Sequence, residues 1–101
     1  MQVNLKVTAG PYKGRIFSFT QHDTFLIGRS ENAHLYLPED RFFSRHHCLL
    51  EIAPPRCFLR DLGSTNGIKV NGRRVDPQRA QSLKRGDELE IGTSHVTFEL
   101  E

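Results

Sequence analysis

Short segments in which apolar and polar residues alternate follow one another along the whole chain, and turn-forming residues separate them. Apolar residues spaced two apart place every second side chain on one face of a β-strand. No segment repeats its apolar residues at the helical period over three turns. Asn71-Gly72 lies between two short runs of this kind, and this dipeptide is the strongest local signal for a β-hairpin. The pattern therefore predicts an all-β sandwich of about ten or eleven short strands.

The predicted strands cover residues 3–8, 16–20, 24–27, 34–37, 46–52, 57–62, 68–70, 73–75, 88–91 and 95–100. Both faces of the segment 46–52 are largely apolar, which predicts a strand in the middle of its sheet. The segment 76–85 is irregular. One helical turn and a short strand ending at Leu83 both stay open for it.

The length of 101 residues predicts a single domain over residues 1–101. The N-terminal residues lack the charged and apolar regions of a signal peptide. No apolar run approaches the length of a membrane span. We therefore expect a cytoplasmic protein, or a nuclear one if its source is eukaryotic, with no membrane partner.

The charge of the chain is close to balanced, with 14 Lys and Arg residues against 12 Asp and Glu residues and a net charge of +2. This excess is too small to predict a nucleic-acid partner. Several basic residues outside the motifs described below are expected to be ordinary solvated surface residues: Arg73, Arg74, Arg79, Lys84 and Arg85.

The two cysteines, Cys48 and Cys57, each lie inside an apolar segment. Two cysteines do not form a disulfide framework, so we expect buried and reduced thiols. A disulfide stays open as an alternative, because the two strands of a hairpin would bring facing residues close together.

The sequence has no arrangement typical of an enzyme. It contains no nucleophile elbow, and both cysteines lie in core-like segments. The loop 63–67 (Gly-Ser-Thr-Asn-Gly) is not a nucleotide loop, because no Lys-Ser/Thr follows it and a short β segment begins after it. The histidines and cysteines lack the spacing of a zinc site. We therefore expect no catalysis, no metal and no cofactor.

Three turn segments carry groups suited to binding an anion. Gly28-Arg29 follows a strand and offers a guanidinium, which binds phosphate through paired hydrogen bonds. Ser44-Arg45 precedes a strand and offers a hydroxyl and a second guanidinium. Residues 63–67 offer hydroxyls, an amide and backbone N–H groups. Each residue alone is more often a turn residue or a surface ion-pair partner. The loops of a sandwich gather at its two ends, however, so the combination predicts one shared anion site.

The order and spacing of four motifs resemble those of the forkhead-associated (FHA) domain. The motifs are Gly28-Arg29, Ser44-Arg45-His46-His47, Asp61-Leu62-Gly63-Ser64-Thr65-Asn66-Gly67 and Val70-Asn71-Gly72. The similarity covers nearly the whole chain, from the first hairpin to the last strand. It implies an eleven-stranded β-sandwich of the SMAD/FHA-like type with its binding loops at one end. It also implies a non-catalytic function, which is the binding of phosphothreonine in an extended peptide.

The resemblance implies a role for each motif residue. Arg29 would contact the phosphate directly, and Ser44 would donate its hydroxyl to a phosphate oxygen. Thr65 would add a contact from the third loop. Arg45 stands where the family often has a basic or amide side chain, so it implies a second phosphate contact. Asn66 would hydrogen-bond the peptide backbone beside the phosphothreonine.

The same resemblance implies structural support from His47, which would brace the loops from inside, and from Gly28 and Gly67, which would permit tight backbone geometry. One departure is Phe42, which stands where some family members have a further basic residue. Phe43 is expected to pack in the core, whereas core packing and ligand contact both stay open for Phe42.

We therefore expect a signalling module that binds a threonine-phosphorylated protein or peptide and is a monomer as an isolated domain. A shallow surface pocket predicts micromolar affinity, on the order of −8 kcal/mol. The alternative is a phospho-independent scaffold or self-association domain of the same fold. The intact set of Arg29, Ser44, Thr65 and Asn66 argues against that alternative. Weak net charge and the lack of interleaved exposed aromatic residues argue against a nucleic-acid partner.

Overall fold

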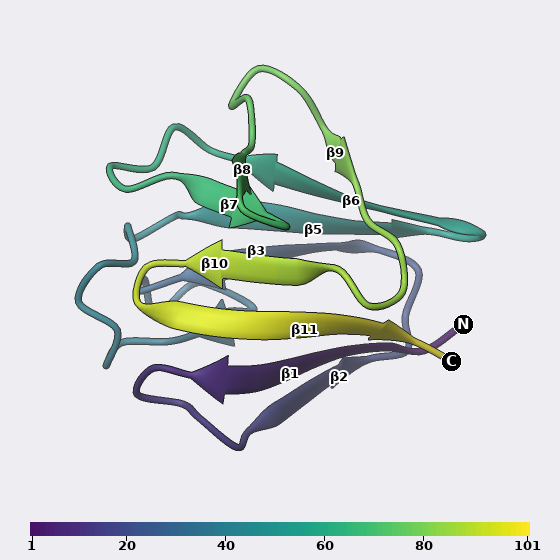
Figure 1. Cartoon of the computed structure of the whole chain (residues 1–101), viewed down its shortest axis with the longest axis horizontal. Helices are drawn as coiled ribbons and strands as arrows, with labels where there is room; N and C mark the ends of the chain where they lie inside the picture. Colours follow the sequence, from purple (N-terminus) through teal and green to yellow (C-terminus); the bar gives the residue numbers. More distant parts are fainter.

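The computed structural model describes residues 1–101, and its eleven strands form two stacked sheets, as the sequence predicted (Figure 1). The strands are β1 (Val3–Ala9), β2 (Ile16–Phe19), β3 (Thr24–Gly28), β4 (Leu35–Tyr36), β5 (Cys48–Ala53), β6 (Arg56–Asp61), β7 (Ile68–Val70), β8 (Arg73–Arg74), β9 (Gln81–Ser82), β10 (Glu88–Ile91) and β11 (Ser94–Leu100). The structure contains no helix.

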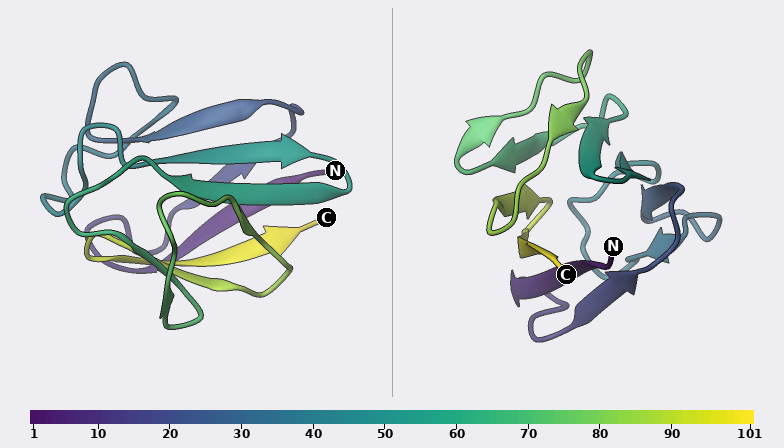
Figure 2. Two further views of the ribbon diagram at one scale, coloured as in Figure 1. Left: turned by 90° about the horizontal axis from the view of Figure 1, so that it is seen from above. Right: turned by 90° about the vertical axis from the view of Figure 1, so that its right-hand side faces the viewer.

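The first sheet has six strands in the order β2-β1-β11-β10-β7-β8, and the second has five in the order β4-β3-β5-β6-β9. The predicted central strand is confirmed, since β5 lies in the middle of the second sheet. All strand pairs are antiparallel except β3 and β4. Figure 2 shows the two layers from the side.

The hydrophobic core fills the space between the two sheets. In β5 the buried residues Cys48, Leu50 and Ile52 alternate with more exposed ones, and β1 buries Val3, Leu5 and Val7. Nineteen buried apolar residues from both layers form one cluster. The apolar residues that recur at every second position of the sequence therefore form the face of each strand that points towards the other sheet.

The hairpin predicted at Asn71-Gly72 joins β7 and β8. Both residues have positive φ, 51° for Asn71 and 80° for Gly72, as a tight two-residue hairpin turn requires. The Asn71 side chain also accepts a hydrogen bond from the Glu88 backbone N–H at 2.9 Å and donates to Asp87 Oδ1 at 3.0 Å. The turn is thereby attached to the start of β10.

The predicted strand limits agree with the structure to within one residue, except in two segments. Strand β5 begins at Cys48, and His46 and His47 lie in a turn before it. The segment 76–85 holds the short strand β9, which pairs with Phe58 and Leu59 of β6, so the strand alternative was right and the helical turn was wrong.

Cys48 and Cys57 are both free and buried, as expected. The open disulfide alternative is wrong, because Cys48 pairs with Asp61 and Cys57 pairs with Ile52. The two cysteines therefore lie four residues apart along the hairpin, a spacing of about 13 Å. A disulfide requires Cα atoms within about 7 Å. Burial, with the negative charge of Asp61, raises the pKa of the Cys48 thiol above its ordinary value, and burial raises that of Cys57.

The chain termini and the loops with the sequence motifs lie at opposite ends of the sandwich. Figures 1 and 2 show the N- and C-termini side by side at one end. Strand β3 ends, β5 begins and β6 ends at the other, since Ile27, Cys48 and Asp61 are in register. No helix long and apolar enough to cross a membrane is present.

Candidate functional site

The site is built from three segments, called here the first loop (residues 28–30), the second loop (residues 40–47) and the third loop (residues 63–67). The first and second loops are joined by backbone hydrogen bonds. Arg29 N–H donates to the Ser44 carbonyl at 3.1 Å, and Ser30 N–H donates to the Arg45 carbonyl at 3.0 Å. A Cβ atom on Gly28 would overlap the Arg45 carbonyl oxygen. Only glycine at position 28 therefore allows the two loops to approach this closely.

His47 lies between the second and third loops, with no exposed surface. Its Nδ1 accepts a hydrogen bond from Ser44 N–H at 3.0 Å, and its Nε2 lies 2.9 Å from the Gly67 carbonyl oxygen. A carbonyl only accepts, so Nε2 carries the proton and Nδ1 keeps its lone pair for Ser44. The imidazole packs against the Phe43 ring with centroids 5.1 Å apart. His47 is thus in contact with both loops through one neutral tautomer.

The third loop places Thr65 beside Ser44. Thr65 N–H donates to Ser44 Oγ at 3.1 Å. Ser64 points the other way, because its Oγ accepts from Gly67 N–H at 3.0 Å and its own N–H donates to Asp61 Oδ1 at 2.9 Å. The loop therefore closes on Ser64, holds the Thr65 backbone at the Ser44 hydroxyl and leaves the Thr65 side chain exposed.

Arg29 and Asn66 both donate to carbonyl groups of the second loop. Arg29 Nη1 lies 3.4 Å from the Arg41 carbonyl oxygen, and Asn66 Nδ2 lies 2.9 Å from that of Phe42. These contacts place the guanidinium and the amide beside neighbouring residues of the turn at 41–42. The Phe42 ring is 55% exposed, so core packing is wrong for Phe42, whereas Phe43 is 4% exposed and packs in the core as expected.

Asp40 is a residue that the sequence reasoning missed. Its carboxylate is buried and accepts from Thr93 N–H at 2.9 Å, from the Ser94 hydroxyl at 2.8 Å and from Phe42 N–H at 3.1 Å. It therefore attaches the second loop to the turn between β10 and β11. A Cβ on Gly92 in that turn would lie 2.8 Å from Asp40 Oδ1, so the fit is close. No signal near Asp40 in the sequence identifies this contact, because its partners in that turn lie 53 residues or more away.

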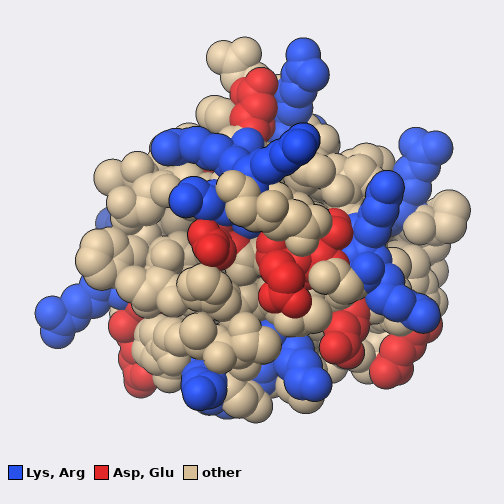
Figure 3. Space-filling view, in the orientation of Figure 1, with Lys and Arg blue, Asp and Glu red and all other residues tan.

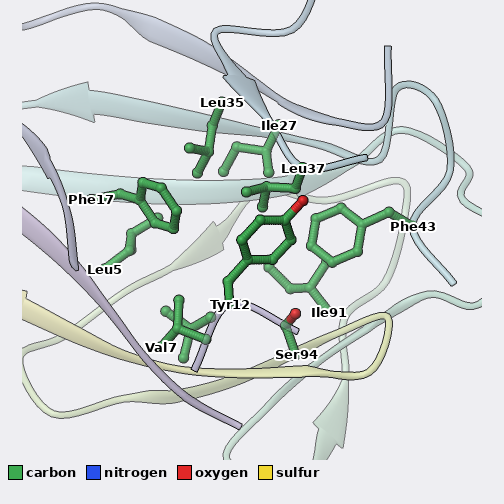
Figure 4. A pocket seen from close by; sticks show the side chains of 11 residues that line it. Leu5, Val7, Tyr12, Phe17, Ile27, Leu35, Leu37, Phe43, Ile91 and Ser94 are labelled. Carbon is green, nitrogen blue, oxygen red and sulfur yellow. The ribbon is translucent and has the colours of Figure 1, made fainter. Parts of the chain in front are cut away.

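Tyr12, in the connection between β1 and β2, supports the start of the second loop from the side of the core, through the residue that precedes it. Its hydroxyl accepts from Glu39 N–H at 2.8 Å, while its ring lies over the apolar interior (Figure 4). The space left among these side chains is about 20 Å³, which is too small for an organic ligand. This interior therefore supports the second loop from the core side and offers no binding pocket.

The electrostatics of the three loops favour an anion. The side chains of Arg29, Arg41 and Arg45 are exposed, and none lies within 4.0 Å of a carboxylate oxygen. The two nearby carboxylates in the sequence, Asp40 and Asp61, are buried and hydrogen-bonded to backbone N–H groups instead. Three exposed arginines without an acidic partner thus lie in the same joined loops as Ser44 and Thr65. An anion placed there gains charge-assisted hydrogen bonds.

The predicted site residues are therefore all at one end of the sandwich. Arg29, Ser44, Thr65, Asn66 and His47 are connected by the hydrogen bonds described above, with Gly28 and Gly67 at the contact points. Arg45 belongs to the same loop, and its exposed side chain makes no hydrogen bond within the protein. No three His, Cys, Asp or Glu side chains gather in a way that could hold a metal ion.

Comparison with known proteins agrees with the fold and with the motifs. The family model described as FHA domain matches residues 25–92. The chain is 34% identical over 94 residues to an oxoglutarate dehydrogenase inhibitor of Corynebacterium glutamicum, which covers 93% of this chain and 62% of that protein. It is 27% identical to an FHA domain-containing protein of Arabidopsis thaliana, over 89% of this chain and 23% of that protein. The chain thus spans less than two thirds of the length of these relatives.

Solved structures give the same result. A structure from a study of phosphothreonine-dependent FHA domain interactions superimposes on this chain with a TM-score of 0.86 and 30% sequence identity. The superposition covers 100% of this chain and 98% of the other.

Proposed function

The chain belongs to the FHA domain family, and on this premise we propose that residues 1–101 form one FHA domain that binds phosphothreonine in an extended segment of another protein. The similar structure solved in a study of phosphothreonine-dependent interactions supports this proposal. The bound protein, the enzyme that phosphorylates it and any further domains are not specified by the proposal. The chain acts by binding and not by catalysis.

The arrangement around Ser44 carries the proposal. Its carbonyl accepts from Arg29 N–H, its N–H donates to His47, and its Oγ accepts from Thr65 N–H at 3.1 Å. Oγ accepts from Thr65, and its own hydrogen has no acceptor within the protein, so it can donate outwards. Ser44 thereby joins the backbones of Arg29 and Thr65, whose exposed side chains lie at the same end of the sandwich, and its own hydroxyl is aligned by the third loop.

A phosphate monoester fits these donors in charge and in number. Near pH 7 it carries about −1.5 to −2 charge and has three acceptor oxygens. The Arg29 guanidinium would bind two of these oxygens. One hydroxyl, of Ser44 or Thr65, would bind the third oxygen, and the other hydroxyl would add a second hydrogen bond to an oxygen that Arg29 also binds. Arg45 would supply a second positive charge. The site is exposed, so these ionic contacts are screened by salt, and affinity falls as ionic strength rises.

Asn66 would distinguish a phosphorylated peptide from free phosphate. One amide hydrogen of Asn66 is used by the Phe42 carbonyl at 2.9 Å. Its Oδ1 and the second amide hydrogen have no partner within the protein. They match the N–H and C=O of one residue in an extended chain, which point to the same side of that chain. The exposed ring of Phe42 lies next to this clamp and would pack against a side chain of the peptide.

Titration of one peptide in phosphorylated and unphosphorylated form tests the proposal. The wild-type chain is expected to bind only the phosphothreonine form, with micromolar affinity. Arg29→Ala is expected to abolish this binding without changing the β-sheet circular dichroism spectrum, because Arg29 is exposed. Arg56→Ala is the matched control, since it removes an exposed arginine from the opposite end of β6. Equal affinity of the wild type for both peptides would refute the proposal and favour a phospho-independent scaffold.

A further inference from the structure

Arg74 lies against the third loop, although it belongs to a different strand. That strand is β8, the edge strand of the first sheet. A Cβ atom added to Gly67 would lie 3.0 Å from Arg74 Nη2 and 3.1 Å from Nε and Cζ. The guanidinium therefore packs flat against Gly67, the residue that follows Asn66. Position 74 was expected to be an ordinary solvated residue, and the structure places its charge directly behind the peptide clamp.

The charges around Arg74 leave it without a partner. On the outer face of the sheet Arg74 is in register with Lys69, and Lys69 is in register with Glu90. Like charges directly opposite each other on a sheet are destabilising. Lys69 has Glu90 as its other neighbour, whereas Arg74 lies at the edge, and no carboxylate oxygen is within 4.0 Å of it. Figure 3 shows the basic side chains gathered over β7 and β8, with acidic ones over β10.

A surface hollow connects Lys69 of this basic pair with the clamp. Asn66, Gly67, Lys69, Glu90 and Gly92 line it, so it begins at the clamp residue and passes along the outer face of the first sheet. Glu90 lies at its far side, where its carboxylate is 3.9 Å from His95 Nδ1. A peptide held by Asn66 thus has a path from the phosphate site to Lys69, and Arg74 is the partner of Lys69 on the neighbouring strand β8.

We propose that Arg74, together with Lys69, binds an acidic side chain close to the phosphothreonine and so selects ligands with acidic residues on one side of it. This inference rests on the proposed phosphothreonine binding and adds a second anion contact outside the phosphate site. The acidic group is a carboxylate or a second phosphate, since both fit a guanidinium fork. The contact would also relieve the like-charge opposition between Arg74 and Lys69.

Four phosphothreonine peptides of one length test this inference against wild-type and Arg74→Gln chains. One has neutral flanks, one has two Glu residues before the phosphothreonine, one has two after it, and one has phosphoserine in place of a Glu on the preferred side. We expect one Glu peptide to bind the wild type about fivefold more tightly than the neutral peptide, as an ion pair of about 1 kcal/mol gives. A stronger gain with phosphoserine than with Glu would identify a second phosphate as the preferred group, and the reverse would identify a carboxylate.

The decisive quantity is the ratio of the affinities for the acidic and the neutral peptide. In Arg74→Gln the ratio of affinities is expected to fall to about half or less of its wild-type value, because only Lys69 remains, whereas Arg56→Gln, an equal loss of charge at the far end of β6, is expected to keep it. If Arg74 only supports Gly67, Arg74→Gln weakens all peptides by the same factor and the ratio is unchanged. That result, or a wild type with no preference for either Glu peptide, overturns the inference. Binding of the neutral phosphorylated peptide, compared with its unphosphorylated form, reports separately on the proposed function.

Discussion

Replacement of Asp40 by asparagine exchanges one oxygen of a buried side chain for an NH₂ group, and the structure predicts a large loss of stability. The two carboxylate oxygens face donors only: Phe42 N–H at 3.1 Å, Thr93 N–H at 2.9 Å and the Ser94 hydroxyl at 2.8 Å. The new NH₂ group also donates. The Ser94 hydroxyl can rotate to accept from it, but a backbone N–H cannot. An NH₂ group at the Oδ1 position faces Phe42 N–H, and one at the Oδ2 position faces Thr93 N–H, which then keeps only its longer hydrogen bond to Oδ1 at 3.2 Å.

The size of the effect follows from these contacts. A buried N–H group that loses its acceptor costs about 1–3 kcal/mol, with the low end for Thr93 because it keeps Oδ1, and the loss of the charge weakens the remaining hydrogen bonds by about 1 kcal/mol in total. We therefore expect the free energy of unfolding to fall by about 2–4 kcal/mol. For a domain of this length, that lowers the thermal midpoint by at least about 8 °C.

Urea unfolding of wild type and Asp40→Asn, followed by far-UV circular dichroism, measures this difference. Glu31→Gln is the matched control, because it converts an exposed carboxylate that makes no hydrogen bond or ion pair into an amide. Its stability is expected to stay within about 0.5 kcal/mol of the wild type. An Asp40→Asn chain as stable as this control would refute the assignment of Asp40 as the attachment point of the second loop. A second readout is phosphopeptide affinity below the midpoint, which should fall because the same loop carries Ser44.

Three further predictions concern single groups. Asn66→Ala should weaken phosphopeptide binding about tenfold but leave affinity for free inorganic phosphate, both measured by titration calorimetry; full peptide affinity in this variant would exclude the backbone clamp. Gly28→Ala should force the first and second loops apart because its Cβ meets the Arg45 carbonyl, so phosphopeptide binding should be lost and the amide signals of both loops should shift in NMR spectra. Burial and the charge of Asp61 raise the pKa of Cys48, so the folded chain holds this proton more strongly than the unfolded chain. Stability should therefore be complete below the ordinary thiol pKa of about 8.5 and fall as pH rises above it, and urea unfolding at about pH 7.5 and 9.5 should show a smaller fall in Cys48→Ala.

The strands and their turns could be predicted because their signals are local. Alternation in residues such as Val3, Leu5 and Val7 needs only neighbouring positions to be read. Asn71-Gly72 specifies its hairpin because these two residues tolerate positive φ. The apolar faces of β5 likewise indicated the centre of a sheet. The same local reading could not choose between a helical turn and a strand for residues 76–85, because β9 exists only through its pairing with β6.

The motif residues of the site could also be identified from the sequence, since each of the three loops contains its own polar groups at family-like spacing. The contacts that their side chains make could not be predicted from the sequence. The sequence left Phe42 open between core and surface, and the structure exposes it while burying Phe43. It also left open a disulfide between Cys48 and Cys57, which the register of the β5–β6 hairpin excludes.

The sequence by itself determined an all-β chain with three polar loops of the FHA type. Only the tertiary structure decided that Asp40 attaches the second loop to the β10–β11 turn and that Arg74 packs against Gly67. The physical reason is the range of the interactions. Strand and turn preferences arise from steric and hydrogen-bonding effects among adjacent residues, whereas a buried carboxylate or an edge-strand guanidinium acquires its partners when separate segments are brought together by the packing of the two sheets.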